Sequence, residues 1–367
     1  MADIRETDHT PPTIYDVARV AGVSIASVSR VLNGRRNPRE ETRERVLQAV
    51  AELGFVPDGA ARALSGRLKE VVGVVIRRVR WIEASEGGFS EQDESLIFTD
   101  VINRGIELAA QRQGFNLLLS SVDADDHDVS KRLLALARKS DGLILHDRVL
   151  EPDQLDQLSR RVPIVTLANV ATKTTTNVHS DNSSGMRDLA RHLLADHGYR
   201  SLAYLAGLAD SPDSLARRET IAAEAAKSGA LVMTGPQWQG NYYASGGARV
   251  IEQLFAGGAA LPRAIACAND QTALGVMYAL AQHGIDVPGD VAVTGFDDIP
   301  MARHLRPQLT TVRQPIQEIG ATAFDVLHSM ISNGAAAEHD VILPTRLIVR
   351  ASCGCPAQLT SPAWRVA

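Results

Sequence analysis

The sequence predicts an α/β protein in which a small, all-helical head precedes a larger core of parallel strands and helices. Three observations predict this class. The chain has 367 residues, enough for two or three domains of about 100–200 residues each. Residues 13–53 carry three short amphipathic segments separated by turn residues. From residue 71 onward, apolar strand-like runs alternate with helical patterns, which is typical of parallel sheets with helical crossovers.

Composition and charge narrow the class of protein. Apolar residues make up 45% and charged residues 22%, as in ordinary globular chains. The sequence has neither the run of about 18 apolar residues of a membrane helix nor an N-terminal signal peptide, so we expect a cytoplasmic protein without membrane contact. Residues 13–69 hold ten Lys and Arg against six Asp and Glu, whereas the remainder holds 28 against 37. This asymmetry suggests that only the head meets a polyanion.

The three cysteines, Cys267, Cys353 and Cys355, are too few for a disulfide framework. A Cys-x-Cys pair can ligate a metal ion, but no third or fourth ligand stands at a suitable spacing in the sequence. We therefore expect reduced structural thiols, and neither a metal nor a cofactor.

The sequence of the head predicts three helices, over residues 14–21, 25–32 and 40–53. Thr13 and Ser24 can cap the first two, and Gly22 between them supplies the left-handed residue that a helix end favours. The apolar positions recur three to four residues apart and form one inward face: Val17, Ala18, Ala21, Val28, Val31, Leu32, Val46, Val50 and Leu53. Two short helices across a three-residue turn, braced by a third, form a helix-turn-helix whose second helix can enter a DNA major groove.

The segment TIYDVARVAGVSIASVSRVLN (residues 13–33) closely resembles the DNA-binding head of the LacI/GalR family of transcriptional regulators, and TRERV (42–46), ELGFVP (52–57) and ARAL (61–64) continue the resemblance. It implies that Ile25, Ala26 and Arg30 face the bases. The first two can make only apolar contacts, as with thymine methyl groups, whereas Arg30 can bind a guanine edge with two hydrogen bonds. Phosphate contacts are implied for Ser24, Ser27, Ser29, Asn33 and Thr42. For each serine, simple helix capping is the alternative.

Residues 58–70 correspond to the family's hinge helix and linker, which is ordered only on operator DNA. The resemblance places Leu64 as an apolar wedge in the minor groove, where it would unstack a base step and kink the duplex. Six residues are too few to hold a helix alone in water, which suits an order–disorder switch. Alternatively, Leu64 packs on the core.

The apolar runs in the sequence of the core predict two series of buried parallel strands. The first covers residues 71–76, 115–119, 142–145 and 164–167, and the second covers 202–205, 264–267 and 291–294. Ligands in such sheets bind at the carboxyl ends of the strands.

The core resembles the periplasmic sugar-binding fold of the LacI/GalR family, through SDNSSG (180–185), Arg217, ANDQTALG (268–275), VTGFDD (293–298) and LTTVRQP (309–315). The fold class is therefore α/β: an N-terminal three-helix helix-turn-helix domain and a periplasmic-binding-protein-like core of two doubly wound parallel-sheet lobes. The lobes would be joined by three crossing strands near 178–181, 310–314 and 338–341. The expected boundaries are a disordered extension 1–12, the helix-turn-helix domain 13–57, the hinge 58–70, the core 71–353 and a tail 354–367, with the first lobe over 71–179 and 313–338 and the second over 180–312 and 339–353.

The resemblance places a small-molecule ligand between the lobes. Arg217, Asn269 and Asp297 are the leading candidates to hold it, because a guanidinium fork and a carboxylate each make paired hydrogen bonds to vicinal hydroxyls. Secondary candidates are polar residues near strand ends and aromatic residues that could cover a sugar face: Asp147, Asn169, Gln314, Trp238, Tyr242 and Tyr243. Each could instead be an ordinary polar or packing residue.

Residues 77–98 form a loop longer than the family pattern leads us to expect, and it carries Trp81 and Phe98. A loop of this length is usually functional or disordered. A lid, an added ligand contact and disorder all stay open.

The resemblance implies a homodimeric, ligand-responsive transcriptional regulator, a repressor of carbohydrate uptake or catabolism genes that a sugar inducer releases from a pseudopalindromic operator. The tail has two prolines and no leucine heptad, which favours a dimer over a tetramer. One alternative is a repressor that needs a non-sugar corepressor; another is an architectural DNA-bending protein with a non-functional cleft. A transport protein would need an export signal. An enzyme is disfavoured because the chain has no P-loop, GxGxxG, nucleophile elbow or His/Glu metal motif.

Overall fold

The computed structural model describes residues 12–32, 39–55, 68–78, 97–123, 126, 128–146, 148–169, 172–334 and 340–356. The chain divides after Glu70 into two compact units, a head and a core. Several expectations fall outside the described residues: Asn33, the hinge helix with Leu64, Trp81 with most of the long loop, Asp147, and nearly all of the extension and the tail.

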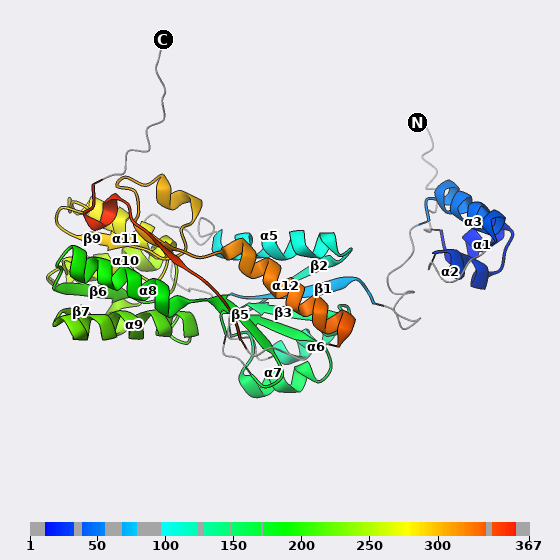
Figure 1. The fold of residues 1–367 in the computed structure, drawn as a ribbon, viewed down its shortest axis with the longest axis horizontal. Helices are drawn as coiled ribbons and strands as arrows, with labels where there is room; N and C mark the ends of the chain where they lie inside the picture. The colour runs from blue at the N-terminus through cyan, green and yellow to red at the C-terminus, as the bar shows by residue number, and fades with distance from the viewer. Residues whose placement is uncertain are drawn as a thin grey trace, which may run out of the picture. The chain divides into compact units, whose positions relative to one another are not determined.

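The head consists of α1 (Ile14–Ala21), α2 (Ile25–Leu32) and α3 (Glu40–Leu53), with the bounds that the sequence predicts (Figure 1). Asp16 stabilises the first turn of α1. Its carboxylate accepts hydrogen bonds from the backbone N–H and the hydroxyl of Thr13, at 2.9 and 2.8 Å. The three helices enclose a small apolar core: Val17, Ala18, Ala21, Val28, Val46, Ala49 and Phe55. The other expected inward residues lie at the margin of this core and are partly buried: Val31, Leu32, Val50 and Leu53.

The first lobe of the core is built on a parallel sheet in the order β11-β5-β4-β3-β1-β2. Its strands are β1 (Val71–Arg78), β2 (Asn116–Asp123), β3 (Gly142–His146), β4 (Ile164–Leu167), β5 (Thr176–Ser180) and β11 (Asp340–Leu343). Helices α5 (Ile97–Arg112) and α12 (Ile316–Asn333) cover one face, and α6 (Val129–Ala137) and α7 (Pro152–Ser159) cover the other (Figure 1).

Strand residues alternate between these two layers. Val72 and Val74 pack with Ile106 and Phe324 beneath α5 and α12, whereas Val75 packs in the cluster of α6 and α7. Successive side chains of a strand point to opposite faces, so a central strand covered on both sides is apolar throughout. This explains why β1 appears in the sequence as an unbroken apolar run.

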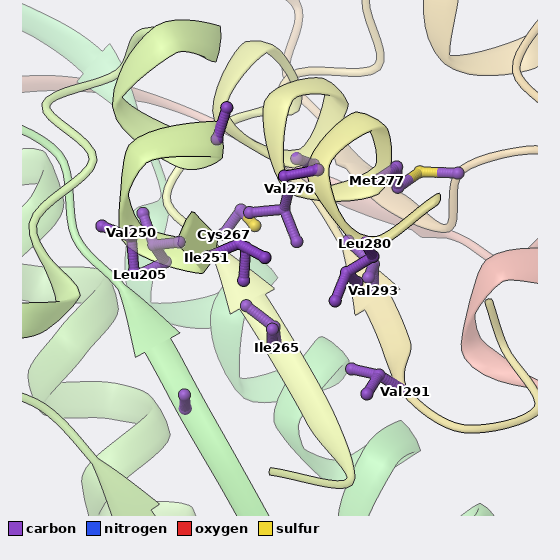
Figure 2. Packing of buried hydrophobic residues seen from close by; sticks show 14 of the residues in the cluster. Leu205, Val250, Ile251, Ile265, Cys267, Val276, Met277, Leu280, Val291 and Val293 are labelled. Carbon is purple, nitrogen blue, oxygen red and sulfur yellow. The ribbon is translucent and has the colours of Figure 1, made fainter. Parts of the chain in front are cut away.

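The second lobe contains a four-stranded parallel sheet in the order β7-β6-β8-β9. Its strands are β6 (Ser201–Leu205), β7 (Leu231–Met233), β8 (Ala264–Cys267) and β9 (Ala292–Thr294). Figure 2 shows the face on which Leu205, Ile265 and Val293 pack against α10 (Ala244–Ala256) and α11 (Asp270–Gln282). The opposite face is covered by α8 (Asn182–Arg191), the π-helical turn His192–Asp196 and α9 (Pro212–Ser228). Three short 3-10 helices, Pro236–Trp238, Pro300–Arg303 and Ala351–Cys353, complete the lobe.

The chain passes between the lobes after β5, after β10 (Thr311–Arg313) and after β11. The last of these crossings differs from the expectation that residues 339–353 belong to the second lobe. Asp340–Leu343 instead pairs in parallel with β5 and forms the edge strand of the first sheet. The chain then enters β12 (Arg346–Ile348), which pairs antiparallel with β10. Among the helices that the structure describes, none is long and apolar enough to cross a membrane.

Candidate functional site

The turn between α1 and α2 is held by Arg45 of α3. Its guanidinium donates hydrogen bonds to the carbonyl oxygens of Ala21 and Gly22, at 2.6 and 3.1 Å. Gly22 has a φ of 63°, and a Cβ atom at this position would lie 2.5 Å from Arg45 Nη2. The turn therefore favours glycine for its left-handed backbone, and a Cβ atom here would also displace the Arg45 guanidinium from its hydrogen bonds.

Helix α2 presents one face to solvent. Ser24 caps it by accepting a 3.2 Å hydrogen bond from the backbone N–H of Ser27, and its hydroxyl lies 3.0 Å from that of Ser27. Ile25 is 41% exposed although it is apolar, and Ala26 and Arg30 are also exposed. Arg30 Nε donates to the carbonyl oxygen of Ala26 at 3.1 Å, which lays the guanidinium along this face.

The expected base-contacting residues thus share one exposed face of α2, while Val28 behind them is fully buried. Of the residues expected to contact phosphate, Ser24 is exposed, and Ser27, Ser29 and Thr42 are partly exposed. The hydrogen bonds of Ser24 and Ser27 show that capping is present.

The core contains a cleft that residues of both lobes line. From the first lobe come the carboxyl ends of β1, β3, β4 and β5 and the start of α5: Ile76, Arg77, Phe98, Thr99, Ile102, His146, Leu167, Ala168, Val178, His179 and Ser180. From the second lobe come Leu208, Ser211, Asp213, Arg217, Asn241, Tyr242, Tyr243, Asn269, Gln271 and Asp297, and Gln314 and Ile319 follow the second crossing. The cleft therefore lies where parallel strands end, as expected.

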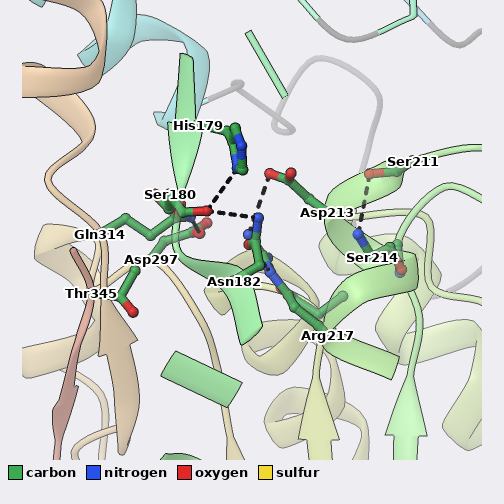
Figure 3. A network of polar contacts seen from close by, with 12 residues as sticks. His179, Ser180, Asn182, Ser211, Asp213, Ser214, Arg217, Asp297, Gln314 and Thr345 are labelled. Carbon is green, nitrogen blue, oxygen red and sulfur yellow. Dashed lines mark hydrogen bonds and ion pairs between the residues drawn. The ribbon is translucent and has the colours of Figure 1, made fainter. Parts of the chain in front are cut away.

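Arg217 is the central cation of the second-lobe wall (Figure 3). Its Nε donates to Asn182 Oδ1 at 2.8 Å, and its Nη1 donates to the carbonyl oxygen of Ala268 at 2.5 Å. Its Nη2 lies 3.7 Å from an Asp213 carboxylate oxygen, and the guanidinium carbon lies 3.7 Å from the centre of the Phe296 ring. These contacts hold the charge rigidly at the cleft although the side chain is almost completely buried.

Asp297 and Gln314 connect the two lobes. Gln314 Nε2 donates to Asp297 Oδ1 at 2.6 Å, and the Ser180 hydroxyl at the end of β5 donates to Gln314 Oε1 at 2.5 Å. Asp297 has a φ of 129°, a region that L-residues rarely adopt, and its backbone pairs with Val312. Burial raises the pKa of its carboxyl to about 7, although Arg217 and the hydrogen bond from Gln314 oppose the change.

Asn269 and Tyr242 line the cleft with much of their polarity already satisfied. Asn269 caps α11 by accepting from the N–H of Thr272, and its amide donates to the carbonyl oxygen of Tyr242 at 3.0 Å. The Tyr242 hydroxyl lies 2.8 Å from the Ser211 hydroxyl. These hydrogen bonds hold both residues in place in the wall of the cleft.

Two of the expected ligand contacts, Trp238 and Asn169, do not line the cleft. Trp238 is only 2% exposed and packs in the apolar cluster beneath α10 and α11, so it does not line the cleft. Asn169 is buried behind the end of β4, where its backbone bonds the amide of Asn177, and it is also absent from the lining. Both residues are buried, which residue type and position in the sequence do not reveal.

The sequence interpretation missed His146 and His179 of the first-lobe wall. His146 is the last residue of β3, and its Nε2 is buried without a hydrogen-bond partner among the described residues. Burial lowers its pKa to about 4, so the ring is neutral at physiological pH. A polar residue that ends an otherwise apolar strand is the signal that could have identified it.

The Cys-x-Cys pair, which has no further candidate ligand at a suitable sequence spacing, gains two in the fold. In the structure His192 and His197 approach Cys353 and Cys355. Because the two pairs are separated by more than 150 residues, no sequence spacing could indicate the cluster.

Comparison with known proteins identifies both units. Residues 13–58 match the family model described as bacterial regulatory proteins, lacI family, and residues 190–353 match a periplasmic binding protein-like domain. The chain is 32% identical to catabolite control protein A of Priestia megaterium, over 93% of this chain and 98% of that protein. It is 31% identical to the ribose operon repressor of Escherichia coli K12, over 93% and 99%.

A solved structure of the lac repressor dimer bound to operator and the anti-inducer ONPF has a TM-score of 0.78 to this structure, with 27% identity over 94% of this chain and 99% of that one. The cellobiose complex of the transcriptional regulator CelR matches with a TM-score of 0.64 and 27% identity, over 93% and 99%. With relatives above 30% identity along nearly its whole length, the chain belongs to the LacI/GalR family of transcriptional regulators.

Proposed function

We propose that this protein is a homodimeric repressor that binds a pseudopalindromic operator through α2 and is released from it by a small polyhydroxylated effector, a sugar. The observation that supports this most strongly is the polar cleft between the lobes. It combines a fixed guanidinium, a buried carboxyl group, an amide and two imidazoles with an apolar rim. Paired donors and acceptors beside apolar surface suit the hydroxyls and the ring faces of a carbohydrate.

The leading ligand contacts are Arg217, Asp297 and Gln314, with His146 opposite them. A ligand that bonds groups of both lobes stabilises one arrangement of the lobes over another. Only this difference in affinity can shift a conformational equilibrium, with coupling of typically about 1–3 kcal/mol. The related ribose repressor, the CelR–cellobiose complex and the lac repressor support a sugar as the ligand class.

On the DNA side, Arg30 supplies base discrimination, and Ile25 and Ala26 supply apolar contacts in the major groove. A dimer would place two α2 helices in successive major grooves of a twofold site, and Leu64 would kink the step between them. A protein with this target acts on the nucleoid in the cytoplasm.

The test uses the full-length protein. Double-stranded operator sequences are first selected from a random pool, and binding of the selected duplex is followed by fluorescence anisotropy while monosaccharides, disaccharides and purines are added. We expect one sugar to lower operator affinity by about 5–150-fold. Release by no compound would favour the architectural DNA-bending alternative, and tighter binding on addition would indicate a corepressor.

A matched pair of variants assigns the response to the cleft. Arg217→Lys keeps the charge but removes the planar fork, so it should retain operator affinity and lose the sugar response. Arg191→Lys is the control, because Arg191 is paired with Glu224 at the surface of the same lobe. Equal responses in the two variants would show that the ligand binds elsewhere.

A further inference from the structure

Two histidines and two cysteines converge in the second lobe, outside the ligand cleft. The ligating atoms of His192, His197, Cys353 and Cys355 all lie within 4.8 Å of one another. His192 Nε2 lies 3.3 Å from Cys353 Sγ and 3.2 Å from His197 Nε2. Cys355 Sγ lies 3.4 Å from His197 Nε2 and 3.8 Å from His192 Nε2.

These separations correspond to the edges of a metal-centred tetrahedron. With Zn–N bonds of about 2.0–2.1 Å and Zn–S bonds of about 2.3 Å, tetrahedral geometry gives edges of about 3.3–3.8 Å between ligand atoms. Four of the six separations among the ligand atoms, from 3.2 to 3.8 Å, fall in or next to this range. With all four ligand atoms within 4.8 Å of one another, the cluster is compact enough to share one tetrahedral ion.

The backbone is adapted to bring the two histidines together. His192 and His197 are five residues apart, so in a regular α-helix they would point about 140° away from each other. Here α8 continues into a π-helical turn, His192–Asp196, and the N–H of His197 donates to the carbonyl oxygen of His192 at 3.2 Å. Such wide turns place residues i and i+5 on the same side and are frequent at functional sites.

The residue between the cysteines is also constrained. Gly354 has a φ of 103°, and a Cβ atom there would lie 2.8 Å from the Tyr199 hydroxyl and 3.4 Å from a ring carbon of His197. The Tyr199 hydroxyl donates to the carbonyl oxygen of Cys353 at 2.8 Å. These contacts fold the Cys-x-Cys segment back over the imidazoles.

His192 has the hydrogen-bond partner on its second ring nitrogen that metal-binding histidines usually have. His192 directs Nε2 at the cysteines, while its Nδ1 lies 2.9 Å from the carboxylate of Asp196. A carboxylate on the far ring nitrogen fixes the tautomer and orientation of a metal-bound imidazole. His192 and Cys353 are buried, so the interior of the cluster is shielded from solvent.

We propose that His192, His197, Cys353 and Cys355 bind a structural Zn²⁺ ion. Two imidazoles and two thiolates in tetrahedral arrangement are a donor set that selects zinc. Four protein ligands leave no open position, so the role is structural. The ion would tie the segment after β12 to the end of α8, two parts of the lobe that are far apart in sequence.

The test measures metal content of the full-length protein, purified under reducing conditions, stripped with a chelator and reloaded with Zn²⁺. We expect one zinc ion per chain by plasma emission spectroscopy. Reloading with Co²⁺ should give the visible absorption bands of a tetrahedral site together with thiolate-to-cobalt charge transfer. Zinc should raise the melting temperature by several degrees, since an ion that binds only the folded state stabilises it.

Variants assign the ion to this cluster. Cys355→Ser and His197→Gln alter partly exposed ligands, so the protein should stay folded while it loses the cobalt bands and the thermal shift. Cys267→Ala, which removes a buried thiol of β8 away from the cluster, should keep both. A reloaded wild-type protein without metal, or full zinc content in a Cys355→Ser/His197→Gln double variant, would overturn the proposal.

Discussion

Arg77, near the end of β1 in the first lobe, donates a 2.7 Å hydrogen bond to the carboxylate of Asp210, which lies just before α9 in the second lobe. Arg77 also lines the cleft, and its side chain is only 18% exposed. The ion pair therefore joins the two lobes at the cleft. It contributes to the relative stability of this lobe arrangement.

We expect Arg77→Gln to weaken ligand binding by about two- to fivefold, because an ion pair of this exposure contributes up to roughly 1 kcal/mol. Isothermal titration calorimetry measures the affinity, and a double-mutant cycle with Asp210→Asn isolates the pair. Arg148→Gln is the control, since it breaks an ion pair with Glu151 that lies within the first lobe. An equal loss of affinity in both arginine variants would contradict a role of Arg77 in joining the lobes.

Arg30 should determine one base position of the operator. Arg30→Ala removes a side chain that can make two hydrogen bonds to guanine, so the preference at that position should weaken by about 1–3 kcal/mol. Competition binding with duplexes that vary at each position measures the change. Arg19→Ala, which removes an exposed arginine paired with Asp16 on α1, is the control. An unchanged base preference in Arg30→Ala would exclude Arg30 as the residue that recognises guanine.

Asp297 should make the stability of the core depend on pH. Its carboxyl has a pKa raised by burial to about 7, whereas the unfolded chain has an ordinary value of about 3.9. Between these values the folded protein holds a proton that the unfolded chain has released. The contribution of this group to stability therefore falls as the pH rises from about 4 to 7 and is constant above that.

Asp297→Asn should accordingly flatten the pH dependence of the free energy of unfolding, measured by urea denaturation of the ligand-free protein between about pH 4 and pH 8. Asp270 should leave a residual slope, because burial, and then the neighbouring Asp297, raise its pKa as well. Asp153→Asn, at an exposed position of α7, should leave the slope unchanged. A slope that is equally steep in Asp297→Asn would refute the assignment.

The head and the seven strands that appear as apolar runs follow from local sequence signals, whereas β7, β12 and part of the cleft wall do not. Thr13, Gly22 and Ser24 determine their helix ends through contacts within a few residues, which is why the predicted bounds of α1 and α2 are correct. Arg217 and Asp297 were identified by resemblance to the family, and they do line the cleft.

The errors arise where the answer depends on tertiary packing. Residue type alone does not distinguish Trp238 from a tryptophan that stacks on a sugar. Only its packing with α10 and α11 shows that it belongs to the apolar core. The extra strand Asp340–Leu343 is too short to be assigned to a lobe before its pairing with β5 is known. The cluster of His192, His197, Cys353 and Cys355 requires both the fold and a π-helical turn, neither of which sequence spacing reveals.

His146 provides the sharpest test of the cleft as a ligand site. Its Nε2 is buried without a partner among the described residues, which costs the ligand-free protein free energy. His146→Leu should therefore raise the free energy of unfolding by about 1 kcal/mol and weaken sugar binding by about 3–10-fold, because a net hydrogen bond is lost only in the complex. Urea denaturation and calorimetry measure the two effects. His179→Leu should instead destabilise the ligand-free protein, since His179 Nδ1 lies 2.9 Å from the carbonyl oxygen of Ser180 and its Nε2 lies 3.4 Å from Asp340. A His146→Leu protein that is less stable and binds sugar normally would show that this nitrogen does not face the ligand.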